Sequence, residues 1–235
     1  MKKLMRYIVD LIFPPRCAVC DEVIPIGSEV CDKCYEKLST GMDDAKLCIR
    51  CGKPLNSCIC CNITSVSAIT SAFEYCAETA PLIERLKSDA DSNAAALLAI
   101  LMANRFSKSS FGNINFDCIT YVPSGDDRIG AKGFDHARRL AEQLSALVDI
   151  PCLAPPVLQT SQYRTQHELD RIERVSNARI GYKLSSDKSI GKTVLLVDDI
   201  VTTGATLDRC AKLMIACGTR EVYCITAATT FIRNG

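Results

Sequence analysis

The chain lacks both a marked excess of charge and any long apolar run. Its 235 residues carry 28 lysines and arginines against 27 acidic residues, which gives a formal net charge of +1. Such a balance removes the usual electrostatic argument for a dedicated nucleic-acid-binding protein. No apolar run reaches the roughly 18 residues of a membrane-spanning helix, so the sequence predicts no membrane span.

The N-terminus also lacks the features of a secretory signal. Asp10 interrupts its apolar residues, and no small-residue cleavage site follows them. We therefore expect a short amphipathic helix within residues 1–15. Histidine is scarce as well, since His136 and His167 are the only two in the chain, and the sequence identifies no cysteine or carboxylate partner for either. A place on the surface is therefore a better expectation for both histidines than a role in acid–base catalysis.

Cysteine, in contrast, is abundant and unevenly distributed. Nine of the 15 cysteines lie between Cys17 and Cys61, and the other six are scattered over the rest of the chain in apolar surroundings. The scattered cysteines suit small core residues. An odd total, with unpaired thiols in expected strands, indicates a reducing compartment, and we therefore expect the protein in the cytoplasm.

The cysteine-rich region contains four Cys-x-x-Cys pairs. Each pair directs two thiolates to one ion from a tight turn, and two pairs complete a tetrahedral site with four sulfur ligands. A crossed pairing is an alternative to a sequential one, and Cys60 is an alternative to Cys61. A disulfide framework and an iron–sulfur cluster fit the compartment and the paired spacing less well. The sequence thus predicts two structural zinc ions held by sequential pairs: Cys17, Cys20, Cys31 and Cys34, then Cys48, Cys51, Cys58 and Cys61.

The most informative segment is VLLVDDIVTTGATL, residues 194–207. Its four leading apolar residues suit a central parallel strand that ends at Asp198 and Asp199. Open α/β sheets bind ligands at the carboxyl ends of their strands, where two acids can hold sugar hydroxyls or a hard cation. The turn around Gly204 then opens a helix, whose N–H groups favour an anion. Together these features indicate a phosphorylated sugar with Mg²⁺.

Two other interpretations of this segment fit less well. A nucleotide P-loop requires Gly-Lys followed by Ser or Thr, and no such sequence follows Gly204. An ordinary capped helix explains one Asp or one Thr, but not two acids and three threonines in this order.

The pattern of the remaining sequence predicts the class of fold. From Ile119 onward, strands and helices alternate with the spacing of βαβ units, which predicts an α/β protein with a parallel sheet. We expect strands within residues 64–76, 118–123 and 221–229, and helices at 81–87, 93–106, 134–148 and 205–216.

The segment that begins at Val194 resembles the 5-phosphoribosyl-1-diphosphate (PRPP) signature of the type I phosphoribosyltransferases. That signature runs as apolar residues, two acids, a short spacer and Thr-Thr-Gly-x-Thr. The resemblance implies that Asp198 and Asp199 are catalytic residues that hold the ribose diol or its Mg²⁺. It also implies a type I phosphoribosyltransferase-like fold with helices on both faces of the sheet. The implied cradle for the 5′-phosphate is Thr202, Thr203, Gly204, Ala205 and Thr206.

Two further elements extend this resemblance. Val122-Pro123 precedes a K-G-F-D-H element at residues 132–136, and a T-Q element at residues 165–166 precedes a helix with arginines and Asn177. With the cysteine pairs in front, this order is similar to that of the ComF family of competence-associated, phosphoribosyltransferase-like proteins. The resemblance covers essentially the whole chain. It implies a zinc-binding double zinc ribbon domain at residues 1–62 and a phosphoribosyltransferase-like domain at residues 63–235.

The resemblance also implies two groups of residues around the ligand. The sequence departs from the family's R-G-F-N-Q pattern, because Lys132 replaces the arginine and Asp135 replaces the asparagine. Lysine offers phosphate a point charge rather than a planar fork, so weaker PRPP binding or loss of turnover is the alternative expectation. A solvated loop and a surface helix are the alternatives for the two groups. They are a pyrophosphate loop with Ser124, Arg128 and Lys132, and a flap with Gln166, Arg171 and Arg174.

Two functions are consistent with these features. The first is an enzyme that transfers a phosphoribosyl group, with Mg²⁺, to a nitrogenous base or related acceptor in a DNA-uptake context. This chemistry needs no covalent nucleophile, and the sequence offers no obvious one. The second is a non-catalytic accessory protein of DNA uptake, which binds PRPP, a nucleotide or single-stranded DNA, or contacts other DNA-uptake proteins.

Overall fold

The structure is a computed structural model that describes residues 13–26, 28, 30–39, 42, 46–87, 92–124, 135–160 and 181–231. Most of the predicted N-terminal helix and the whole predicted flap lie outside these residues. Arg128 and Lys132 of the predicted pyrophosphate loop also lie outside them.

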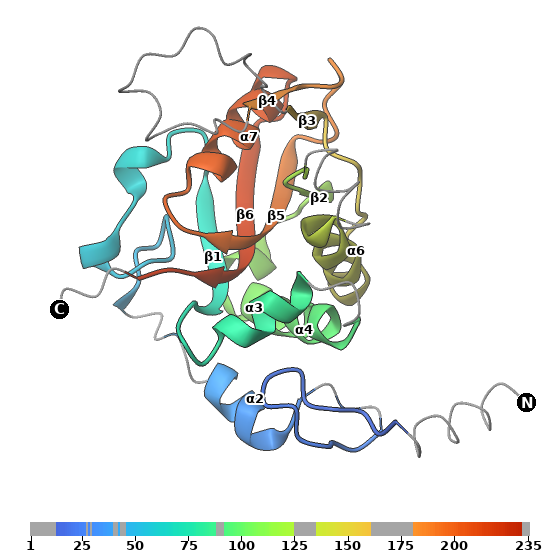
Figure 1. The fold of residues 1–235 in the computed structure, drawn as a ribbon. Helices are drawn as coiled ribbons and strands as arrows, with labels where there is room; N and C mark the ends of the chain where they lie inside the picture. Colours follow the sequence, from blue (N-terminus) through green and yellow to red (C-terminus); the bar gives the residue numbers. More distant parts are fainter. Residues whose placement is uncertain are drawn as a thin grey trace, which may run out of the picture.

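Four parallel strands form the central sheet, in the order β1-β6-β5-β2 (Figure 1). β5 and β6 occupy the middle, and residues 194–197 of β5 are buried, which explains their uninterrupted apolar sequence. β1 forms one edge, in the region where the sequence predicts strand. The strand bounds are Ala68–Glu74 for β1, Cys118–Tyr121 for β2, Thr193–Val201 for β5 and Glu221–Thr229 for β6.

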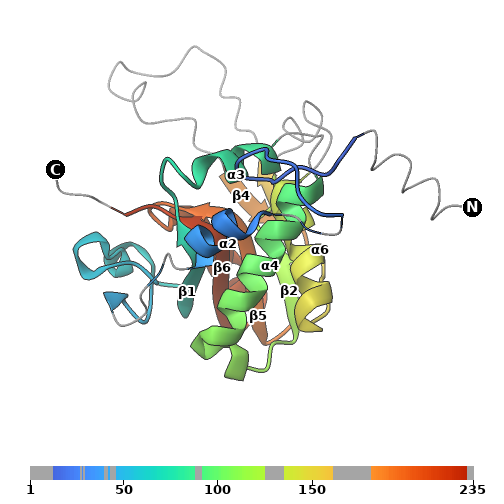
Figure 2. The same cartoon turned by 90° about the horizontal axis from the view of Figure 1, so that it is seen from below.

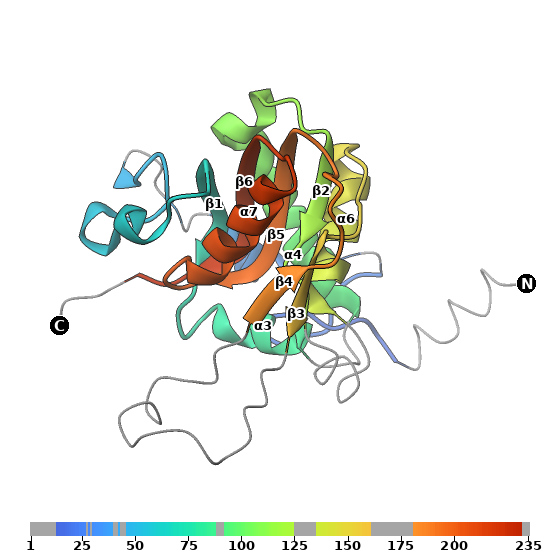
Figure 3. The ribbon, with the colours of Figure 1, turned by 90° about the horizontal axis from the view of Figure 1, so that it is seen from above.

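Helices cover both faces of this sheet (Figure 3). α4 (Ser92–Lys108) and α6 (His136–Val148) pack on one face, with α3 (Ala80–Leu86) against α4, while α7 (Ala205–Ala216) packs on the other face. The buried residues of α7 recur at the spacing of a single helix face, which fixes the side it turns to the sheet. They are Leu207, Cys210, Ala211 and Met214. The predicted α/β fold is therefore confirmed.

The shorter elements connect or flank this framework. β3 and β4 pair antiparallel beside α7, outside the strand–helix alternation that the sequence predicts. The bounds are Asp32–Ser39 for α2, Val157–Thr160 for β3 and Gly181–Leu184 for β4, with 3₁₀ turns η2 (Leu55–Ser57), η3 (Cys60–Asn62) and η4 (Ser110–Asn113).

The two faces of the sheet bury separate cores, and each core receives residues from a different part of the cysteine-rich region. Ala18 and Leu38 join the core beneath α3, α4 and α6. Cys51, Ile59 and Ile63 join the core beneath α7. Seen from below, α2 accordingly lies against α4, whereas the segment around residues 46–63 lies apart from it beside β1 (Figure 2).

The end of β5 differs from the sequence-based expectation. β5 does not end at the paired acids, because Ile200 and Val201 continue its pairing with Ala228 and Thr229 of β6.

Within the described part of the chain, no helix has both the length and the apolarity needed to cross a membrane.

Candidate functional site

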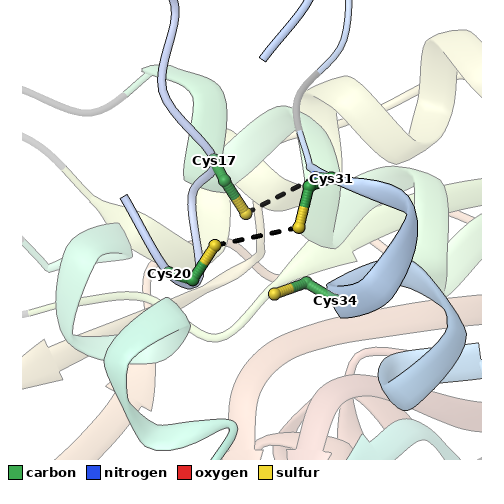
Figure 4. Close-up of side chains that lie close together, drawn as sticks. All are labelled: Cys17, Cys20, Cys31 and Cys34. Carbon is green, nitrogen blue, oxygen red and sulfur yellow. Dashed lines mark hydrogen bonds between the residues drawn. The ribbon is translucent and has the colours of Figure 1, made fainter. Parts of the chain in front are cut away.

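The first cysteine cluster brings together four sulfur atoms from two turns. The sulfurs of Cys17, Cys20, Cys31 and Cys34 all lie within 4.8 Å of one another (Figure 4). The backbone N–H groups of Val19 and Cys31 donate to Cys17 Sγ at 3.5 Å. Burial raises the pKa of the Cys17 thiol, but N–H donors of Cys20, Cys31 and Val19 outweigh it and lower that pKa to about 6. These N–H donors favour the thiolate, which is the form of cysteine that binds a metal ion.

The second cluster differs from the prediction at one ligand. The structure gathers Cys48, Cys51, Cys58 and Cys60, and it leaves Cys61 exposed with its thiol directed to the Asn62 side chain. The reason is that the intervening Ile59 is buried in the core beneath α7. With Ile59 turned inward, Cys60 reaches the cluster and Cys61 falls on the outer side of η3.

Both clusters fit a tetrahedral zinc site. Four sulfurs at about 2.3 Å from one zinc ion are about 3.8 Å apart. The separations are 3.7 Å between Cys20 Sγ and Cys31 Sγ, and 3.5 Å between Cys48 Sγ and Cys60 Sγ. A disulfide requires about 2.05 Å between its sulfurs. Two closed sets of four thiolates suit two structural zinc ions, which hold the chain rather than a substrate.

The predicted phosphate cradle is an exposed turn between β5 and α7. The side chains of Thr202, Thr203 and Thr206 are exposed, while Gly204 is buried and has a φ of +77°. Gly204 is the N-cap residue of α7 and offers no side chain to its N–H groups, and the Ala205 N–H donates to Thr203 Oγ1 at 3.4 Å. The first N–H groups of α7 thus face an open turn lined with hydroxyls, as an anion requires.

Asp198 and Asp199 lie in the last part of β5, and Ile200 and Val201 separate them from this turn. The Asp199 N–H donates to Asp198 Oδ1 at 2.9 Å, and the Ile200 N–H donates to Asp199 Oδ1 at 2.7 Å. Burial, the neighbouring charge of Asp199 and a hydrogen bond between the two carboxyl groups hold the pKa of Asp198 well above its usual range. Two interacting carboxyl groups beside an anion-favouring turn can hold a diol or a hard cation.

Asp135, where the family pattern has asparagine, is committed to the backbone. Its carboxylate accepts the N–H of Arg138 at 3.2 Å, which caps α6, and the N–H of Ser124 at 3.0 Å. A single acid therefore ties the first residue of the predicted pyrophosphate loop to the start of α6. Of the predicted loop residues, Ser124 alone lies within the described chain.

Sequence reasoning missed Lys53, which is only 2% exposed. Its ammonium Nζ donates to the carbonyl oxygens of Val201 at 3.4 Å and Thr230 at 2.5 Å, at the ends of β5 and β6. Burial lowers the pKa of Lys53, and the charge of Cys51 opposes that shift. The available signal was a lysine placed directly after a Cys-x-x-Cys-Gly turn.

Comparison with known families finds two domain models along the chain. Residues 8–78 match the double zinc ribbon domain model, and residues 129–233 match the phosphoribosyl transferase domain model. The first match spans both cysteine clusters, and the second spans the paired acids and the turn before α7.

Curated relatives share both parts. The DNA utilization protein YhgH of Shigella flexneri is 27% identical over 92% of this chain and 98% of its own length. The competence protein ComFC of Streptococcus pneumoniae is 26% identical over 88% of this chain and 84% of its own. Among solved structures, adenine phosphoribosyltransferase from Thermoanaerobacter pseudethanolicus superposes with a TM-score of 0.37 at 15% identity, covering 64% of this chain and 84% of that one.

The two domain models, in this order, together with relatives that extend over both, define the architecture. The chain therefore carries a double zinc ribbon followed by a phosphoribosyltransferase domain, and its curated homologues include proteins named for DNA utilization and for competence.

Proposed function

We propose that this protein binds PRPP at Asp198–Thr206 and, with Mg²⁺, transfers its phosphoribosyl group to a nitrogenous base or a related acceptor. The observation that carries the proposal is the exposed threonine turn at the N-terminus of α7, which follows two interacting carboxyl groups near the end of β5. In this arrangement the 5′-phosphate accepts N–H and hydroxyl hydrogen bonds from the turn.

The paired acids define the chemical part of the proposal. Asp198 and Asp199 offer the carboxylate oxygens that the ribose hydroxyls or Mg²⁺ prefer. Bound Mg²⁺ supplies charge stabilisation for the departing diphosphate. As the bond from C1 to the diphosphate lengthens, the ribose gains positive charge, and a carboxylate beside it stabilises that charge. The remaining contribution of this chain is to hold the ribose phosphate in one orientation toward the acceptor.

The biological setting follows from the relatives. Proteins named for competence and for DNA utilization match most of this chain, and we propose that it acts in DNA uptake during natural transformation. We place it in the cytoplasm, because all 15 cysteine thiols are free and the two clusters fit metal rather than disulfides.

A second candidate function is a non-catalytic module that binds PRPP, a nucleotide or single-stranded DNA. The observation that favours it is Asp135, which stands where the family pattern has asparagine. Its carboxylate accepts hydrogen bonds from the N–H groups of Ser124 and Arg138. In that case the 5′-phosphate pocket is retained and diphosphate release is not.

Calorimetry with PRPP, with and without Mg²⁺, separates these functions. In the Asp198→Asn/Asp199→Asn variant we expect PRPP affinity to fall by about 30-fold or more, since losing a desolvated, hydrogen-bonded charge costs roughly 2–5 kcal/mol. The control is Asp187→Asn, which removes an exposed acid from another loop. Diphosphate release with a base supports the enzyme, and PRPP binding without release supports the module. Wild-type protein that binds no PRPP would contradict the enzyme and a PRPP-binding module alike. Single-strand binding that is unchanged in the double variant would favour a module that docks DNA.

A further inference from the structure

The second cysteine cluster is built against the back of the turn to which we assign the 5′-phosphate. A Cβ atom on Gly204 would lie 2.7 Å from Ile63 Cγ2 and 3.0 Å from Ile59 Cδ1. Ile59 stands between two cluster cysteines, and Ile63 follows the last of them. The metal-binding segment therefore determines how far Gly204, and the exposed threonines around it, can move inward.

Lys53 fixes the strand that leads into the same turn. Its ammonium donates to the carbonyl oxygen of Val201, the residue directly before Thr202, and to that of Thr230. A zinc ion with four thiolates carries a net charge of about −2, so the loaded cluster compensates the buried ammonium next to Cys51. Loss of the metal removes this compensation and therefore disfavours Lys53 in its present position.

A third contact reaches the helix that follows the turn. Asp208 lies in the first turn of α7, and its Oδ1 accepts the N–H groups of Thr64 and Ser65 at 2.6 Å each. The segment that carries or directly follows the second cluster thus contacts three parts of this region. These are the end of β5, Gly204 and the first turn of α7. The first cluster makes no contribution to these three contacts, since its buried cysteines form a separate small core beside Arg85 of α3.

From these contacts we propose that the second zinc centre positions the phosphate-binding turn, and that Lys53 is the positioning residue that links them. Zinc at this centre and ribose phosphate at the turn then favour each other's binding, and the linkage is reciprocal. The part of this inference that concerns PRPP rests on the proposed function, whereas the link between zinc and the turn does not.

Hydrogen exchange of the ligand-free full chain tests the link without PRPP. Cys51→Ser and Cys17→Ser each remove one buried ligand, from the second and the first cluster respectively. We expect Cys51→Ser to speed amide exchange in peptides covering residues 198–208, and Cys17→Ser to leave those peptides unchanged. Equal exchange in the two variants would overturn the proposal, as would an increase in Cys51→Ser that extends equally over α4, because that result indicates general loosening.

Lys53→Met tests the linking residue, since it keeps the length of the side chain and removes the ammonium. The matched control is Lys33→Met, which alters an exposed lysine between two cysteines of the first cluster. We expect Lys53→Met to speed exchange at residues 198–208 and to weaken PRPP binding by about 10–100-fold, the usual effect of losing a residue that supports a metal site. Unchanged exchange in a folded Lys53→Met variant would refute its role. If that variant does not fold, the cysteine comparison decides.

The reciprocal effect provides a third measurement. With Mg²⁺ present, saturating PRPP should slow the transfer of one zinc ion per chain to a chromogenic chelator and leave the other unaffected. Equal protection of both ions, or of neither, contradicts the linkage. If wild-type protein binds no PRPP, the proposed function fails, while the exchange experiments still decide whether zinc holds the turn.

Discussion

Each of the two cysteine clusters offers four cysteine sulfurs, but the residues that surround the two clusters differ. Around the first cluster, polar contacts lie near the surface: Arg85 donates to Cys17 O at 3.2 Å and to Asp21 Oδ1 at 3.1 Å, with side chains 28% and 58% exposed. Around the second, a buried lysine reaches the ends of β5 and β6. The role of a structural metal therefore depends on the contacts made by the residues next to its ligands. The identity of the ligands alone does not reveal that role.

The largest expected effect distinguishes the ligands themselves. Native mass spectrometry should find two zinc ions per wild-type chain. Cys60→Ala should lose one of them, and the neighbouring Cys61→Ala should keep both, because Cys60 lies in the cluster and Cys61 is exposed. Structural zinc contributes on the order of 10 kcal/mol to the folding of small zinc domains, so loss of a ligand should also lower the melting temperature. Retention of both ions in Cys60→Ala would restore Cys61 as the ligand.

The next effect concerns the contact between Gly204 and the second cluster. Gly204→Ala should lower the free energy of unfolding by about 1–2 kcal/mol for the left-handed backbone, with about 1–3 kcal/mol more for the collision with Ile63. Gly218→Ala is the matched control, because its φ is +102° but its Cβ would be 3.8 Å from the nearest side chain. Equal losses in urea denaturation would show that Ile63 does not constrain the turn.

A substitution at the paired acids is expected to raise the free energy of unfolding rather than lower it. The raised pKa of Asp198 means that its ionised form destabilises the folded chain, and that stability falls as pH rises through this raised pKa. In Mg²⁺-free buffer, Asp198→Asn should therefore increase the free energy of unfolding at neutral pH while it weakens PRPP binding. Near the ordinary carboxyl pKa of about 4 the gain should vanish. A variant that is less stable at neutral pH would contradict the stated cause.

The smallest effect is expected beside the first cluster. Asp21→Asn removes the ion pair with Arg85, and asparagine tolerates the left-handed conformation of this residue, whose φ is 65°. A half-exposed pair contributes at most about 1 kcal/mol, so the free energy of unfolding should change by less than that. Exchange at residues 198–208 should not change at all. A clear effect on the turn would remove the difference between the two clusters.

Local features of the sequence predict most of this molecule. The start of α7 at Ala205 and the bounds of β6 follow from apolar periodicity and turn residues, and both clusters follow from paired cysteines. What local patterns miss depends on distant contacts. Lys53 contacts Val201, 148 positions later, and the choice of Cys60 depends on where Ile59 packs. The extension of β5 beyond the acids likewise depends on its pairing with β6.

The burial of Ile59 and Ile63 against Gly204 has a practical consequence for dissecting the molecule. A fragment that starts after Cys61 would lack Ile59 and would leave apolar residues behind Gly204 exposed to solvent. Such a shortened polypeptide should aggregate or bind its ligand poorly, even though every residue of the ribose pocket is still encoded. A cut upstream of Cys48 would instead leave the phosphoribosyltransferase domain together with Ile59 and Ile63, the residues that support its turn.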